Sequence, residues 1–575
     1  MSPNVSPDRG SGHGLGRDPD ESQPLPTKNH SPRFWGIFAS LCILAFICAL
    51  DVIIISTAPP TITAVIGGAS QYILIANSFV VTSAVVQPLI GQLADIFGRQ
   101  NPLVASTALF VLGSGVAGGA TSPTMLIIGR TVQGVGAGGL YVLLDIVCCD
   151  LVPLRERGKY VGLMNSFAGV AAALGPPVGG AIAQTDWRWI FYLNIPICGV
   201  ALCGTLLFMR MKTRLPGLHA GKSRLRRIDF VGNLIFVPST LAVLLGLVMG
   251  GIEHPWSSWQ VVLPLVLGGA GWIAFHVQQS FAAHPSLPNR LFSHRTSAIG
   301  LALTFISSVL IQAIGYFLPV YFQALKGTTV LESGTFYLPY AIGTLFFAVM
   351  GGILLAKLGS YRILHIVAFA LSSLGVGLFP LLNSDTPKVA WVFFELISSA
   401  GLGITVSTML PAIMSALAES DVASSTAAYS FIKTCGYVWG VTIASVIFNA
   451  AVNANLDLVS DPAVRDRLRD GRAYAFASEV HGLWEAGTYS TELWSEVVQV
   501  YTRSLQTIWW AGLGFSLVGL VLVFSERSHE LRSELVTEYG LEEREKEKDK
   551  RITTTPIEDG TPLPTNKARE QPLAT

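Results

Sequence analysis

The segment Gly91-Gln-Leu-Ala-Asp95-Ile-Phe-Gly98-Arg99-Gln-Asn-Pro-Leu103 lies between two long apolar runs. Two glycines bracket a carboxylate and a guanidinium follows, so the backbone can turn tightly at this point. Asp95 and Arg99 can pair with each other or dock on the end of a neighbouring helix. We interpret the segment as a charged turn between two membrane-spanning helices.

Apolar runs continue outward from this turn in both directions. Of the 575 residues, 51% are hydrophobic and 13% are charged, and the mean hydropathy is +0.51. Ordinary soluble domains carry about 25% charged residues, and a spanning helix needs about 20 apolar residues. We expect fourteen spans, at residues 35–57, 72–94, 102–121, 124–146, 160–184, 189–209, 229–250, 261–281, 297–320, 334–356, 363–382, 389–412, 425–450 and 506–526.

Lys and Arg gather in the loops that follow the even-numbered spans, whereas the short loops on the other side hold only Arg188, Lys326 and Lys388. Such a bias marks the cytoplasmic side, so we expect both termini in the cytoplasm and the loop 451–505 outside. The polar ends 1–33 and 527–575 cannot bury a core and are expected to be disordered tails. We expect no cleavable signal peptide, so the first span is an uncleaved membrane anchor.

Several functional classes lack their sequence signals. The net charge of +1 argues against a nucleic-acid partner. The seven cysteines lie in or beside apolar runs, which favours neither disulfides nor a metal site. The glycine-rich run 134–139 is followed by Leu140 and Tyr141 rather than the Lys of a phosphate-binding loop. We therefore expect no enzyme, no cofactor and no metal, and an ion gradient as the energy source.

Two further spans carry unusual residues. In span four a polar stripe recurs every three or four residues, which places it on one helix face; it comprises Arg130, Gln133, Ala137, Tyr141 and Asp145. An arginine at membrane depth is costly and normally faces a cavity or a partner. Span five contains Gly175-Pro176-Pro177-Val178-Gly179-Gly180, in which proline kinks the helix and glycine permits close helix crossing.

These motifs resemble those of a known family. Segment 91–103 resembles the signature loop of the major facilitator superfamily, and the Arg130 stripe is similar to its proton-coupling motif. Segment 175–180 looks like the antiporter motif of its drug-exporting members. Segments 51–60, 186–196 and 316–327 are similar to motifs of its fourteen-span drug:proton antiporters, and the resemblance covers about residues 35–526.

The resemblance implies an all-α integral membrane protein with the major facilitator fold, in which two inserted helices separate two pseudo-symmetric six-helix halves. A degenerate echo of the signature loop at 351–362 supports the internal repeat. The expected divisions are a tail at 1–33, the first half at 34–210, a linker with the inserted helices at 211–296, the second half at 297–526 and a tail at 527–575.

Asp51 and Arg130 each lie six residues from the outer end of their span, about 9 Å deep at 1.5 Å per residue. We therefore expect the two to interact, directly or through water, and to couple transport to protons. Glu395 lies at similar depth and is a second candidate for proton or cation binding, whereas Lys433 can snorkel or pair.

Two other groups complete the expected site. The gating candidates are Gly91, Asp95, Gly98, Arg99, Gly175, Pro176, Gly179 and Gly180. The candidates for the substrate cavity are Asn77, Gln87, Gln133, Tyr141, Gln312 and Tyr316. Each of these polar side chains can instead satisfy a neighbouring helix.

We expect a proton-coupled efflux transporter of a hydrophobic drug, fungicide or secondary-metabolite toxin, working by alternating access as a monomer. Its partners would be the small-molecule substrate, protons and lipid, and its place the plasma membrane, with the vacuolar membrane as alternative. An alternative function is uptake of a siderophore-like chelate or vacuolar transport of amino acids. A non-transporting receptor or enzyme is disfavoured, because the external loop is too small for a binding domain.

Overall fold

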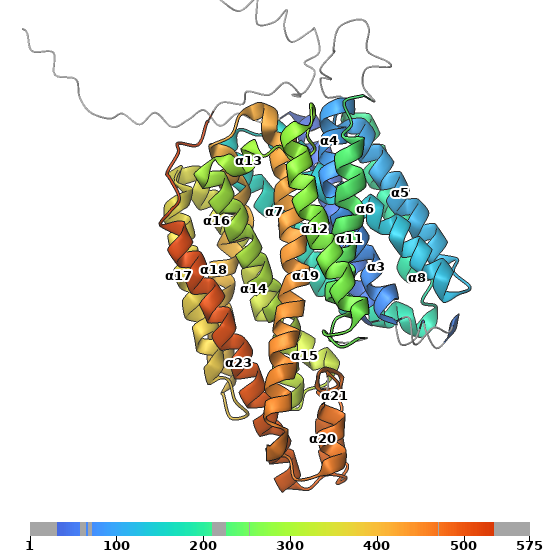
Figure 1. Ribbon diagram of the computed structural model, residues 1–575, viewed down its shortest axis with the longest axis vertical. Coiled ribbons are helices and arrows are strands. Elements are labelled where there is room, and N and C mark those ends of the chain that lie inside the picture. The colour runs from blue at the N-terminus through green and yellow to red at the C-terminus, as the bar shows by residue number, and fades with distance from the viewer. Residues whose placement is uncertain are drawn as a thin grey trace, which may run out of the picture.

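The structure is a computed structural model that describes residues 31–57, 62, 65–66, 72–209, 226–251, 254–469 and 471–533. Long helices run side by side through it (Figure 1). The first half contains α1 (Pro32–Thr57), α3 (Tyr72–Val85), α4 (Gln87–Phe97), α5 (Gln100–Gly118), α6 (Pro123–Leu151), α7 (Leu154–Thr185), α8 (Trp189–Tyr192) and α9 (Asn194–Phe208).

In the part of the connection that the structure describes, from residue 226 on, the helices are α11 (Phe230–Met249), α12 (Trp259–Phe281) and α13 (Arg290–Ser293). The second half contains α14 (Arg295–Lys326), α15 (Val330–Phe336), α16 (Leu338–Leu358), α17 (Tyr361–Leu378), α18 (Lys388–Ser415), α19 (Val422–Ala454), α20 (Pro462–Leu468), α21 (Ala473–Phe476), α22 (Val480–Glu485) and α23 (Thr491–Val523). Short 3-10 turns occupy Phe379–Leu381, Glu419–Asp421 and Leu456–Leu458.

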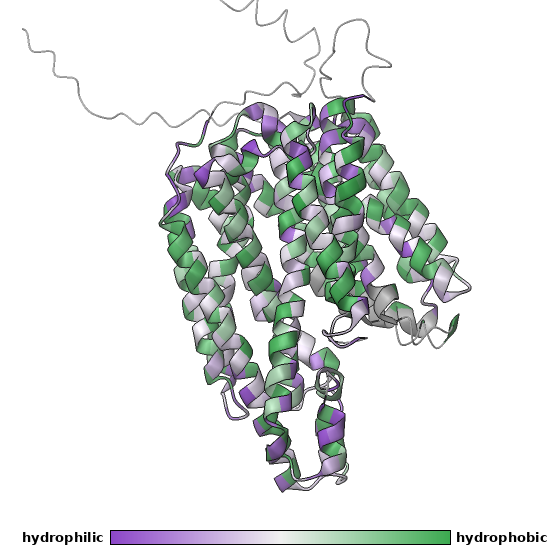
Figure 2. Cartoon of the chain, viewed as in Figure 1, coloured by the Kyte–Doolittle hydropathy of each residue, from purple (hydrophilic) through white to green (hydrophobic). Residues whose placement is uncertain are grey.

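The helices match the predicted spans. Among the described residues, twelve helical segments are long and apolar enough to cross a membrane. The helices Asn77–Val85 and Gln87–Phe97 are bent by 45° relative to each other, and if they form one span the number of candidate spans is thirteen. The 32-residue α7 lies where the fifth span was predicted. These elements are consistent with fourteen spans. Hydrophobic residues follow the helices along their length, and hydrophilic ones gather near their ends and on α20 (Figure 2).

Local chemistry explains where the helices begin and end. The Ser122 hydroxyl accepts a hydrogen bond from the Met125 amide at the start of α6, where Pro123 occupies a position that needs no amide hydrogen. Gly327 and Gly359 end α14 and α16 with φ of 66° and 67°. A side chain would strain this left-handed backbone, so glycine is the natural residue to stop these helices.

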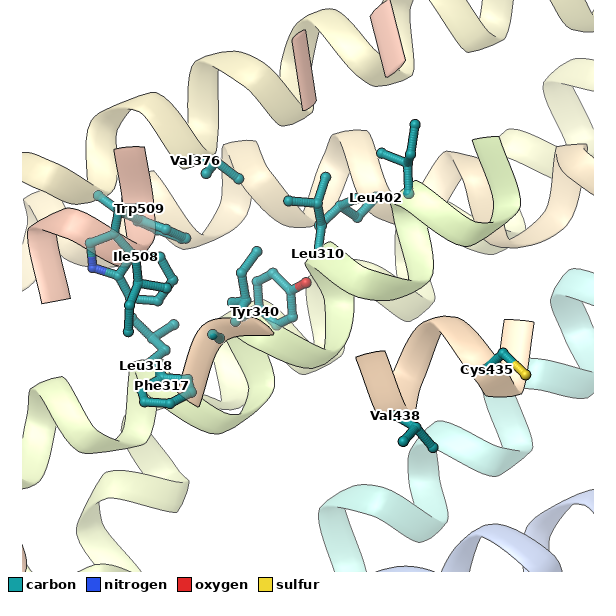
Figure 3. Close-up of a cluster of buried hydrophobic side chains, with 14 of the residues drawn as sticks. Leu310, Phe317, Leu318, Tyr340, Val376, Leu402, Cys435, Val438, Ile508 and Trp509 are labelled. Carbon is teal, nitrogen blue, oxygen red and sulfur yellow. The ribbon is translucent and has the colours of Figure 1, made fainter. Parts of the chain in front are cut away.

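The buried hydrophobic residues form two clusters, one centred on each half. Figure 3 shows part of the second, in which Phe317 and Leu318 of α14 lie near Ile508 and Trp509 of α23. The inserted helices α11 and α12 pack on each other, and α11 also contacts α3 and α19. The Phe236 ring lies 5.0 Å from that of Phe431, so the insertion covers one side of the seam between the halves.

The predicted loop 451–505 is shorter than expected. Helix α19 continues to Ala454 and α23 begins at Thr491, so only 455–490 connects them, partly as short helices. The first turns of α23 are helical because an apolar stripe including Val497, Val500 and Tyr501 is buried, and the Tyr501 hydroxyl donates to the Ala473 carbonyl at 2.6 Å.

The beginning of the predicted C-terminal tail is also packed rather than solvated. Leu531 is buried, and the Arg155 amide donates to the Arg532 carbonyl at 3.1 Å. The Tyr361 hydroxyl donates to the Arg527 carbonyl. These backbone contacts dock residues 527–532 across both halves. The remainder of the predicted tails, 1–30 and 534–575, and residues 210–225 of the predicted linker lie outside the described residues.

Candidate functional site

Asp51 of α1 lies at the centre of a buried polar network in the first half. Its carboxylate accepts hydrogen bonds from Arg130 at 2.5 Å, Gln133 at 2.8 Å and Asn194 at 2.7 Å. The side chains of Asp51 and Arg130 are 0% and 1% exposed. The predicted interaction between these two residues is therefore present and direct.

The network holds Arg130 in a defined place. Its guanidinium also donates to the Gln133 side-chain oxygen at 2.8 Å and lies 4.3 Å from the centre of the Phe79 ring. The Gln133 amide donates to the Ser114 hydroxyl, also at 2.8 Å. A buried charge needs such donors, acceptors and ring faces because water does not reach it. Asp51 and Arg130 therefore form an ion pair that is buried within the first half.

Two members of this network, Asn194 and Ser114, were not among the site residues predicted from the sequence. Asn194 begins α9 within the motif 186–196, and its proximity to a buried carboxylate follows only from the packing of α9 beside α1. Ser114 lies on α5 beside Gly113. Because Gly113 has no side chain, α5 approaches α6 so closely that a Cβ on Gly113 would lie 2.3 Å from the backbone nitrogen of Gln133.

The signature loop forms a second charged cluster at one end of the bundle. Arg99 is buried and donates to Asp95 at 2.9 Å, to Asp150 at 2.7 Å and to the Ala94 carbonyl at 2.7 Å. Gly98 ends α4 with a φ of 82°, a conformation that favours glycine. Asp150 at the end of α6 was not among the predicted residues. The loop therefore clamps α4 to α6.

The end of the bundle that carries Arg99, Arg155, Arg157 and Arg362 is called here the basic end. It lies at the top in Figure 1, opposite α20 and α21. At this end Arg157 of α7 forms a salt bridge with Glu419 of the second half. The Arg155 guanidinium donates to the Ala356 and Lys357 carbonyls at 2.8 and 3.0 Å. These contacts hold the two halves together.

Small residues let the halves meet closely beneath these arginines. A Cβ on Gly91 of α4 would lie 2.4 Å from the Ala427 Cβ of α19. A Cβ on Gly352 of α16 would lie 2.3 Å from the Gly158 carbonyl oxygen of α7. Neither position tolerates a side chain while the halves are in contact. In this conformation the basic end is closed.

Glu395 of α18 lies in the second half with a very different environment from Asp51. It is 0% exposed, and neither carboxylate oxygen has a hydrogen-bond partner among the described residues. The hydroxyls of Tyr340 and Ser398 are also buried without a partner there. A bare carboxylate in such a place is costly, so the geometry suits the neutral acid.

The other predicted residues are scattered by the fold. Gln133 and Gln87 are fully buried, and Gln87 bridges the halves by donating to Thr434 of α19 at 3.0 Å. Asn77, Tyr141 and Gln312 are partly buried, and Tyr316 is 42% exposed. Gln133 therefore belongs to the Asp51 network in this conformation, and not to an open cavity.

The antiporter-like segment of span five lies in α7, and Gly175 is buried. The surroundings of Pro176, Gly179 and Gly180 lie outside what the structure describes. No group of three or more His, Cys, Asp or Glu side chains that could hold a metal ion is present among the described residues.

Comparisons with known proteins place the chain among transporters. Residues 41–441 match the Major Facilitator Superfamily. The MFS efflux transporter aclA of Aspergillus oryzae is 43% identical over 531 residues, which cover 91% of this chain and 95% of that protein. The MFS-type efflux pump LUC4 of a Fusarium species is 41% identical over 536 residues, covering 93% and 94%.

A solved structure of the proton:xylose symporter XylE is similar in fold, with a TM-score of 0.51, 15% identity and coverage of 79% of this chain and 95% of that one. At this identity the likeness concerns the fold alone. It agrees with the two helical halves described above.

Proposed function

Because the chain belongs to the major facilitator superfamily, we propose that it exports a hydrophobic small molecule across the membrane by alternating access, driven by protons that move the opposite way. The substrate class is a secondary-metabolite toxin, a drug or a fungicide. Fungal relatives that are more than 40% identical carry the names efflux transporter and efflux pump, which supports the direction of transport.

The contrast between two buried carboxylates carries the proton-coupling part of the proposal. Every contact that Asp51 makes with Arg130, Gln133 and Asn194 comes from a donor, which suits an ionised carboxylate. Glu395 has no donor among the described residues and suits the neutral acid. A membrane carboxylate that gains and loses its donors as helices move can bind and release a proton.

The closed basic end supports the alternating-access part of the proposal. We propose that this end is cytoplasmic, following the distribution of Lys and Arg in the loops, so that both termini are cytoplasmic. The membrane we propose is the plasma membrane, with the vacuolar membrane as the alternative. The Arg157–Glu419 bridge and the Gly91 contact would then close the cytoplasmic gate. Opening this gate must break the contacts between the halves, while the Asp51 network, which lies within one half, can change independently.

The test is transport into energised inside-out vesicles from cells that express the full chain. Wild type should accumulate a neutral hydrophobic dye such as Nile red when the vesicle interior is acidic, and an uncoupler should abolish accumulation. The Asp51→Asn variant should lose the gradient-dependent part, because its side chain cannot release a proton. Gradient-dependent accumulation that survives this substitution contradicts coupling through Asp51. Gradient-dependent loss of dye from preloaded vesicles would instead favour uptake.

A further inference from the structure

Lys433 of α19 is a partly buried cation without a carboxylate in contact among the described residues. It lines a small cavity between α14, α18 and α19, on the side of the second half that faces α6. Among the described residues no carboxylate is within salt-bridge distance of its ammonium group, and the centre of the Tyr429 ring lies 5.7 Å from it. A partly buried ammonium without a counter-ion is stabilised by a ligand that brings a negative charge.

Asp145 of α6 lies in the other half, on a helix that packs against α19. It is 8% exposed, and it has neither a salt bridge nor a hydrogen bond among the described residues. Helices α6 and α19 pack on each other, and the charges of Asp145 and Lys433 are close enough to interact without touching. The pair therefore spans the seam between the halves, where alternating access must open.

Two tyrosine hydroxyl groups belong to the same cavity lining as the cation. Tyr429 and Tyr437 lie one helical turn before and after Lys433 on α19, and all three line the same cavity. Neither hydroxyl has a hydrogen-bond partner among the described residues, in contrast to Thr304 and Ser307 of α14, which donate to carbonyls of their own helix. Two unused hydroxyl donors beside one positive charge match a group that offers several acceptor oxygens and a negative charge.

We propose that Lys433 binds an acidic group of the exported molecule, and that Asp145 offsets the lysine charge when the site is empty. The preferred substrate is then an apolar molecule with one ionised acid, such as a carboxylate or an acidic enol. This inference rests on the proposed export function and specifies its substrate. Lys433 is a specificity residue in it, and Asp145 competes with the substrate for the lysine.

The small size of the cavity indicates in which conformation the substrate binds. It holds about 10 Å³ in this conformation, which is enough for about one water molecule. A substrate must therefore reach Lys433 when the halves part at the basic end and carry Asp145 away from it. Closure returns Asp145 towards the lysine and so helps to displace the bound acid.

The test measures binding of a matched pair of probes, 1-pyrenebutyric acid and its methyl ester, to the full-length protein in phosphatidylcholine nanodiscs. Equilibrium dialysis gives Kd for each probe, with binding to empty nanodiscs subtracted. The variants are Lys433→Met, Lys433→Arg and Asp145→Asn. The matched control is Lys388→Met, which removes a lysine from the start of α18, outside the cavity. Ester binding and monodisperse elution report whether each variant is folded.

Wild type should bind the acid more tightly than the ester. Lys433→Met should weaken acid binding by roughly ten- to a hundredfold, the worth of a charge-assisted hydrogen bond, and leave ester binding within about twofold. Lys433→Arg should retain most of the preference, and Asp145→Asn should tighten acid binding. Lys388→Met should change neither Kd. If Lys433→Met fails to fold, Lys433→Gln replaces it with the same expectation.

Three results overturn the inference: no preference for the acid in wild type, equal weakening of acid and ester by Lys433→Met, or weakening of acid binding by Asp145→Asn. The last would show that the two side chains simply support each other. Gradient-driven export of Nile red and of 1-pyrenebutyric acid is measured in parallel. If wild type exports either probe but shows no acid preference in binding, only this inference fails. If it exports neither probe, the proposed function fails, and the role of Lys433 in selecting an exported molecule fails with it.

Discussion

The buried pair of Asp51 and Arg130 permits a quantitative prediction through a double-mutant cycle. At a separation of 2.5 Å, two unit charges attract by about 7 kcal/mol at an effective dielectric constant of about 20. Desolvation of both groups offsets part of this, and removal of one partner from a buried pair typically costs about 3–5 kcal/mol because the other charge is left alone. We expect this cost for Asp51→Asn and for Arg130→Gln.

The double variant Asp51→Asn/Arg130→Gln should be less destabilised than the sum of the two, because no uncompensated charge remains. The interaction energy should be about 3 kcal/mol or more, at the top of the range for contacting residues. The assay is SDS-driven unfolding of purified protein in mixed micelles. The matched control is Asp186→Asn, an exposed carboxylate of the same half, expected to change stability by less than about 0.5 kcal/mol. Additive effects in the double variant would refute a coupled ion pair.

Three other predictions concern the basic end. Gly91→Leu should block closure of this end, because even a Cβ at this position would lie 2.4 Å from the Ala427 Cβ. Dye export should fall below about a tenth of the wild-type rate while elution stays monodisperse. Unchanged export would contradict this packing. Arg157→Ala removes the bridge to Glu419, so a cysteine placed in the interface should react faster with a water-soluble maleimide, and an equal rate would count against a gate. Gly98→Ala should destabilise the protein by about 1–2 kcal/mol because φ is 82°, measured by unfolding in SDS; no loss would mean that the turn relaxes.

The positions of the helices could be predicted because membrane spans leave a strong signal in a single sequence. A spanning helix satisfies its backbone internally and needs an apolar surface along about 20 residues, so its existence depends little on the rest of the fold. The prediction was weaker where helices extend beyond the membrane. The first turns of α23 carry Glu492 and Glu496, and the sequence predicts a loop there. Their apolar stripe finds partners that only the fold brings near, such as Ala473 and Phe448 beside Tyr501.

In the candidate site, too, some contacts could be predicted from the sequence and others could not. The contact between Asp51 and Arg130 followed from equal depth on two helices and from the resemblance to a known family. Gln133 was expected in a substrate cavity, but the structure buries it between Asp51, Arg130 and Ser114. A helix stripe shows which residues share a face, but it does not show whether that face meets a cavity or another helix. Asn194 and Asp150 were missed for this reason.

The sequence alone determined that this protein is a helical membrane protein with a charged turn after its second span, since hydrophobic length and short-range motifs are local properties. That it is a transporter followed from the resemblance of these motifs to those of a known family. Only the tertiary structure decided which charges meet. Asp51 finds three donors, and Glu395 finds none among the described residues. Asp145 and Lys433 belong to helices of opposite halves that pack on each other at the seam. The physical reason is that the energy of a charge at membrane depth depends on neighbours that come from distant helices, and on the packing that excludes water around it.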